Sequence, residues 1–95
     1  MSKLSDAILE VLLASGGKFQ EIGGKPFEAI TETDLMTGLR ERGWKLPPAG
    51  YFLSEVRDEG FKVTQGQNFR GKVKRVYDDG TQGRTLAAFN TIIYL

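Results

Sequence analysis

The sequence predicts a single α+β domain in which three helices precede a small antiparallel sheet of two or three strands. One observation is a change of period, because apolar residues recur at helical spacing before residue 60 and alternate with polar residues after it. A second is size, since 95 residues, 40% of them hydrophobic, can form one modest core and little more. We therefore expect residues 1–95 to form one domain.

Three helices are predicted from apolar stripes that end at breaking residues. In each segment the apolar side chains recur three or four positions apart, which places them on one helical face. Thr31 and Asp34 have the spacing of a capping box, and Pro47-Pro48 suits the first turn of a helix. A glycine follows each segment and is a natural C-terminal stop. The predicted helices span residues 3–15, 32–42 and 48–59.

Extended segments are predicted between the first two helices and after the third. Gly23-Gly24 interrupts residues 18–30, which favours a short hairpin or an extended loop there. After Gly60, residues 61–64 and 72–77 alternate as half-buried strands do, and we expect them to pair as a C-terminal hairpin. The apolar segment Phe89–Leu95 predicts one more strand.

Charge is divided unevenly along the chain, although the formal net charge is only +1. Residues 1–60 carry seven Lys or Arg against ten Asp or Glu, whereas residues 61–95 carry six against two. Five cations and no acid lie between Lys62 and Arg75. A cationic segment of this kind is typical of a surface that faces a polyanion, although a solvated hairpin can also be rich in lysine.

Several chemistries are disfavoured by composition. The chain contains neither Cys nor His, so thiolate metal sites, disulfides and imidazole catalysis are absent. Residues 66–72 match a phosphate-binding loop, but Val73 stands where Ser or Thr would hold magnesium. We expect no enzyme activity and no cofactor. Without a signal peptide or a membrane-length apolar run, we expect a cytoplasmic protein with no membrane partner.

The order of the predicted elements resembles the winged-helix domain, a DNA-binding variant of the helix-turn-helix fold. The resemblance is carried by residues 5–14, 31–42, 46–59 and 61–77. It implies that residues 48–59 form the recognition helix in the major groove and that residues 62–75 form a basic wing. The implied function is binding of duplex DNA, as a transcription regulator or as an architectural or partition-type factor.

The DNA contacts implied by this resemblance come from the helix, the wing and a second turn. Tyr51, Ser54 and Arg57 would supply direct readout, while the wing cations would bind phosphates. The acidic residues Glu55, Asp58 and Glu59 on the same helix oppose a deep insertion into the groove. The complete predicted set of DNA-binding residues is Ala49, Gly50, Tyr51, Ser54, Arg57, Lys62, Arg70, Lys72, Lys74, Arg75 and Arg84.

The alternative prediction is a protein–protein interaction or dimerisation module that does not bind DNA. It is favoured by the near-neutral net charge and by the acidic residues of the third helix. The connection between the first two helices is longer than a minimal winged helix needs, and the C-terminal strand is an addition. The segment Phe89–Leu95 is therefore the candidate contact of a homodimer.

Overall fold

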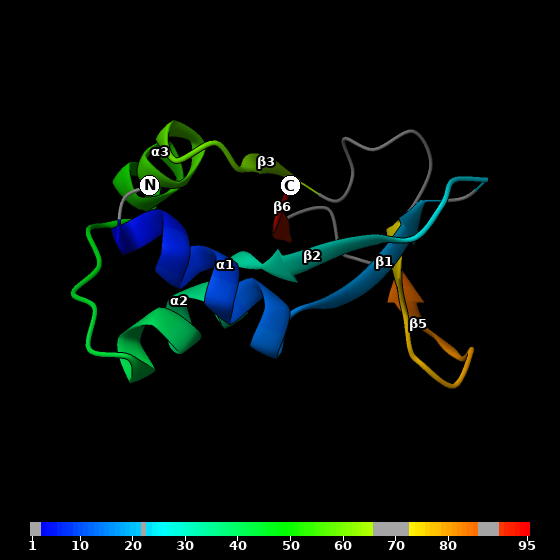
Figure 1. The fold of residues 1–95 in the computed structure, drawn as a ribbon. Helices are drawn as coiled ribbons and strands as arrows, with labels where there is room; N and C mark the ends of the chain where they lie inside the picture. The colour runs from blue at the N-terminus through cyan, green and yellow to red at the C-terminus, as the bar shows by residue number, and fades with distance from the viewer. Residues whose placement is uncertain (1–2, 22, 66–72, 86–89) are drawn as a thin grey trace.

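Three helices and six strands make up the described part of the computed structural model (Figure 1), which covers residues 3–21, 23–65, 73–85 and 90–95. The elements, in chain order, are α1 (Lys3–Ser15), β1 (Gly17–Glu21), β2 (Phe27–Thr31), α2 (Glu32–Glu41), α3 (Ala49–Asp58), β3 (Lys62–Gln65), β4 (Val73–Val76), β5 (Gln82–Thr85) and β6 (Thr91–Tyr94). The α+β class is therefore as the sequence predicts.

The local elements agree with the sequence. All three helices occupy the predicted segments to within one or two residues. The segment around Gly23-Gly24 forms a true hairpin, with Gly17 opposite Ala29 and Phe19 opposite Phe27. The N-cap bond of the predicted capping box is formed, because the Thr31 hydroxyl accepts a hydrogen bond from the backbone N–H of Asp34. Helices α2 and α3 are each followed by a glycine at positive φ, Gly43 and Gly60.

The sheet differs from the prediction of a small winged-helix domain with a three-stranded sheet or hairpin. All six strands form one antiparallel sheet in the order β3-β6-β2-β1-β4-β5. The predicted hairpin of residues 61–77 is wrong, because among the described strands β3 pairs with β6 alone, while β4 pairs with β1 and β5. Its predicted turn, around residues 65–71, lies almost wholly outside the described residues.

Burial explains why β6 replaces β4 as the partner of β3. Ile92 and Ile93 are adjacent and both fully buried, so β6 needs cover on both faces and suits a central strand. Ile93 lies opposite Ile30 of β2 and opposite Val63 of β3. Both edges of β6 are paired within the chain, with β2 and β3, so neither edge is open to a second copy, and the homodimer contact expected at this strand stays a prediction.

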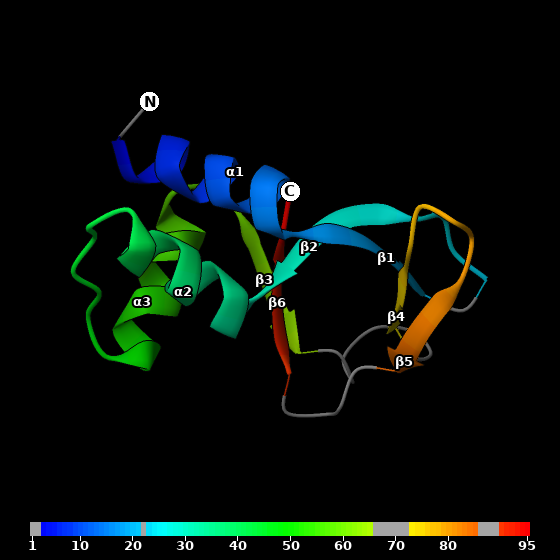
Figure 2. The ribbon, with the colours of Figure 1, turned by 90° about the horizontal axis from the view of Figure 1, so that it is seen from below.

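Two hydrophobic clusters lie on opposite faces of the sheet, because neighbouring residues of a strand point to opposite sides. Ile30 and Ile93 belong to the larger cluster, which the three helices cover. Ala29 belongs to a second cluster with Phe19 and Val73. The helices gather at one end of the molecule and β4 and β5 lie at the other (Figures 1 and 2). The sheet therefore extends beyond the helical layer.

Helices α1 and α2 approach closely at Gly38. A Cβ atom added to Gly38 would lie 2.5 Å from Cγ1 of Val11, which is fully buried in α1. Beside this contact, the Arg42 guanidinium donates hydrogen bonds to Glu10 Oε1 at 3.2 Å and to the Gly38 carbonyl at 3.1 Å. The close contact depends on glycine, while the partly exposed ion pair adds little free energy.

We predict that Gly38→Ala lowers the free energy of unfolding by about 1–2 kcal/mol, as small overpacking substitutions in cores do. Val11 is β-branched and fully buried, so its side chain strongly prefers one rotamer and gives way only at a cost in free energy. The matched control is Gly50→Ala in α3, where an added Cβ meets nothing within 4 Å. Urea unfolding should show the control unchanged or more stable, by up to ~1 kcal/mol. Equal stability of the two variants would contradict this packing.

The turn between β4 and β5 contains a titrating group. Asp79 Oδ1 accepts hydrogen bonds from the Thr81 hydroxyl at 2.6 Å and from the Thr81 backbone N–H at 2.9 Å. The hydroxyl is the larger of these causes, and together they lower the pKa of the Asp79 carboxyl. Because the pKa is lowered in the folded protein, the Asp79 carboxylate stabilises the turn at pH values above the ordinary pKa of Asp. This stabilisation is lost as the pH falls through the lowered pKa.

We predict that Thr81→Val raises the pKa of Asp79 towards its ordinary value, because the variant keeps the shape of the residue and removes the hydroxyl donor. The rise should be partial, since the backbone N–H of residue 81 still donates. Titration of the carboxyl carbon by NMR measures it. A midpoint identical to that of the wild-type protein would show that the hydroxyl does not hold the carboxylate.

Candidate nucleic-acid interface

One face of helix α3 packs against the rest of the domain, and the opposite face is exposed. Phe52 and Val56 are fully buried in the larger cluster, and Leu53 packs against it. The opposite face carries the exposed residues Gly50, Tyr51, Ser54 and Arg57. Tyr51 is 70% exposed, which is unusual for a large aromatic side chain and leaves its ring and hydroxyl available. Four predicted site residues are therefore on one exposed surface.

The N-terminal end of α3 is electropositive. The N-cap residue, Pro48, makes no side-chain hydrogen bond, and the first turn contains no acid. The amides at a helix N-terminus carry a partial positive charge and can donate to an anion. The exposed side chain of Lys45 lies in the segment that leads into this end. Between residues 42 and 54 the sequence contains no acidic residue.

Acidic residues are confined to the later part of α3. Glu55 and Asp58 are exposed, and Glu55 follows Tyr51 by about one turn. These carboxylates oppose the approach of a phosphate to the C-terminal half of the exposed face. An anion is therefore accommodated best at the N-terminal half, around Gly50, Tyr51 and Ser54.

The basic segment predicted as a wing is divided between the two ends of the sheet. Lys62 lies on the edge strand β3, with its Nζ atom 5.8 Å from the centroid of the Tyr94 ring. Lys74 and Arg75 lie on β4, which three strands separate from β3. The domain is 35 Å long, and β4 lies at the end away from the helices (Figure 2). The three described cations of this segment, Lys62, Lys74 and Arg75, therefore do not form one surface.

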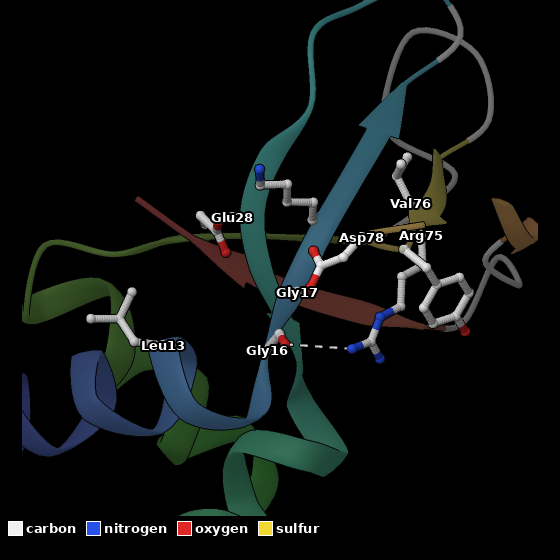
Figure 3. A pocket seen from close by; sticks show the side chains of 9 residues that line it. Leu13, Gly16, Gly17, Glu28, Arg75, Val76 and Asp78 are labelled. Atoms are coloured by element: carbon white, nitrogen blue, oxygen red, sulfur yellow. Dashed lines mark hydrogen bonds between the residues drawn. The ribbon is translucent and has the colours of Figure 1, made fainter. Parts of the chain in front are cut away.

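Arg75 is held by contacts within the domain. Its Nη2 donates to the carbonyl oxygen of Gly16 at 3.4 Å, and its guanidinium lies 5.2 Å from the centroid of the Tyr77 ring. Figure 3 shows this side chain reaching from β4 to the point where α1 gives way to β1. The guanidinium occupies the space that a side chain at Gly17 would need. Arg75 therefore ties β4 to the end of α1.

The pocket at this junction, of about 250 Å³, is lined by charges that balance. Lys18 and Arg75 contribute two cations, while Glu28 and Asp78 contribute two anions. The neighbouring pocket, of about 220 Å³, likewise has Lys74 opposed by Glu21. Neither pocket has the net positive charge that a polyanion would select.

Some predicted site residues cannot be placed. Arg70 and Lys72 lie outside the described residues, as do the side chains of Ala49 and Arg84, although Ala49 opens α3 and Arg84 belongs to β5. Within the described ranges, no group of three or more acidic side chains could hold a metal ion. No described helix is long and apolar enough to cross a membrane.

Sequence reasoning missed two exposed cations near the predicted sites. Lys45 precedes α3, and the prolines that follow it mark the helix start, so its position could have been inferred. Lys18 lies on β1 directly opposite Val76 of β4, and only the pairing of these strands brings it near Arg75. No local pattern in the sequence indicates that pairing.

Comparison of this chain with protein-family models, with curated proteins and with solved structures finds no match.

Proposed function

We propose that this protein binds duplex DNA through the N-terminal half of α3. The observation that carries the proposal is the exposed, acid-free surface of Gly50, Tyr51 and Ser54 at an electropositive helix end. Phosphate oxygens accept hydrogen bonds from helix N-termini, lysine and tyrosine, all of which are present here. The described cation nearest in sequence to this end is Lys45.

The exposed acidic residues of α3 limit how far this helix enters the groove of the DNA. Because Glu55 and Asp58 are exposed beyond the first turns, the helix end meets the backbone and the groove edge, and the rest of the helix does not enter. This assigns α3 mainly to phosphate contacts, which position a protein without reading sequence. Ser54 and Tyr51 are the residues left to reach a base edge.

The far end of the sheet is less suited to DNA. Its described turn carries the exposed residues Asp78 and Asp79, and the cations Lys74 and Arg75 lie in pockets with opposing acids. The proposal therefore places Lys74 and Arg75 outside the DNA contact and assigns Arg75 a structural role. The likeness to winged-helix domains stays a prediction from the sequence, and the hairpin of residues 61–77 that carried part of it is not formed.

We predict that Tyr51→Ala weakens binding to a duplex of about two helical turns (~20 base pairs). The expected loss is about tenfold, the order of one hydrogen bond to a charged group. The matched control is Tyr77→Ala, which removes a 46% exposed tyrosine from the far end of the sheet. Fluorescence anisotropy at low salt measures both affinities.

Equal losses in the two variants would contradict the assignment to α3, and the absence of wild-type binding at low salt would contradict DNA binding itself. That second outcome would favour the protein-interaction alternative. Its candidate surface is the pocket at the end of α1, whose lining includes Tyr77 and Leu13, and Leu13 is 65% exposed.

A further inference from the structure

We infer that the groove between α3 and the end of the β3–β6 pair binds one phosphodiester group of duplex DNA, with Arg57 as its principal ligand. This inference rests on the proposed function and adds a second, distinct contact to it. It changes the role of Arg57 from reading bases to positioning the duplex.

The groove is formed where α3 passes the end of two paired strands. It has a volume of about 220 Å³ and is lined by Leu53, Arg57, Val63, Thr64, Gln65 and Thr91. Leu53 and Arg57 are one helical turn apart, and Gln65 lies opposite Thr91 in the strand pair. Val63 and Leu53 pack against the larger hydrophobic cluster, so the apolar wall of the groove is anchored to the core.

Charge separates this groove from the other two pockets described above. Arg57 is the only ionisable residue among its described lining residues, so its positive charge is unopposed there. The pocket at the end of α1 contains two acids, and the one beside Lys74 contains Glu21. Of the three, only the groove at α3 has a net positive lining.

The Arg57 side chain is also uncommitted. It is exposed, and within the described ranges it makes no side-chain hydrogen bond or ion pair, in contrast to Arg42 and Arg75. A guanidinium presents a planar fork of N–H donors that matches two phosphate oxygens. Thr91 lies opposite Gln65, on the face of the sheet that also carries Val63, and its hydroxyl supplies a further donor on the opposite wall. Cation, donors and an acid-free lining together fit a phosphate ester.

The position of the groove connects it to the proposed DNA surface. Arg57 follows Ser54 by three residues, so the two lie on neighbouring parts of the same helical side. Arg57 lies on the side of α3 that carries Leu53 and lines the groove, whereas Glu55 and Asp58 lie on the other side of Ser54. A duplex that meets the N-terminal half of α3 can thus reach Arg57 with its backbone on the side away from both acids. A contact at each end of the exposed face would fix the register of the helix along the duplex.

The test compares the wild-type protein with Arg57→Gln and with the matched control Lys25→Gln. For each protein, the affinity for the same duplex is measured as a function of salt concentration. Lys25 is an exposed lysine in the β1–β2 turn, remote in sequence from the groove. Loss of one phosphate contact should reduce the slope of log Kobs against log salt by about one in Arg57→Gln, and leave it unchanged in the control. Arg57→Lys should restore the slope but not the full affinity, because it keeps the charge and loses the fork.

The outcomes separate this inference from the proposed function. If the wild-type protein binds no duplex, the proposed function fails and this inference fails with it. If wild-type binding is lost in Tyr51→Ala while Arg57→Gln keeps the wild-type slope, the groove inference alone is overturned. Thr91→Val provides a second check without changing charge, and should weaken binding with an unaltered slope. No change in either affinity or slope for Arg57→Gln and Thr91→Val would overturn the groove.

Discussion

The insertion of β6 between β2 and β3 is the constraint on which the rest of the domain depends. Ile92 and Ile93 point to opposite faces of the sheet, and both are fully buried. The side chain of Ile93 continues the row formed by Ile30 and Val63, on which the helices pack. Without β6 in this place, the helical face of the sheet would be interrupted and both neighbouring strands would have open edges.

This insertion also determines where the charges lie. β3 pairs with β6 on one edge and with no described strand on the other, so the hairpin that the sequence predicts beside α3 is not formed. Instead β4 joins β1, and β5 becomes the far edge of the sheet. Lys62 stays at the helical end, whereas Lys74 and Arg75 are placed at the other end. The proposed DNA surface is consequently built on α3, Lys45 and the groove at Arg57, with little from the segment that is richest in cations.

The sequence was a good guide to local structure and a poor guide to strand pairing. Helices α1, α2 and α3 follow from apolar periodicity and from capping at Thr31, because these signals act over a few residues. Strand β5 was missed, since Gln82–Thr85 has no apolar alternation and depends on β4 for its place. The pairing of residues 62–65 with residues 91–94 joins distant segments, and no turn motif sets its register.

The candidate site likewise has a part that the sequence predicts and a part that depends on strand pairing. The exposed face of α3 was predictable, because Phe52 and Val56 fix which side of the helix is buried. The groove was not, because it requires Thr91 to lie beside Gln65 and both to lie near Arg57. One local feature of β6 does indicate its pairing with strands on both sides. Two adjacent buried isoleucines indicate a strand covered on both faces, which favours a central position in a sheet.

The central claim is that a duplex meets this protein at α3 and the groove beside it. Backbone chemical-shift mapping of the ¹⁵N-labelled protein with a duplex of arbitrary sequence tests it most directly. The account predicts that the largest shifts occur from Lys45 to Ser54 and at Arg57 and Thr91. Shifts centred on β4, β5 and the turn at Asp79, with α3 unchanged, would contradict it.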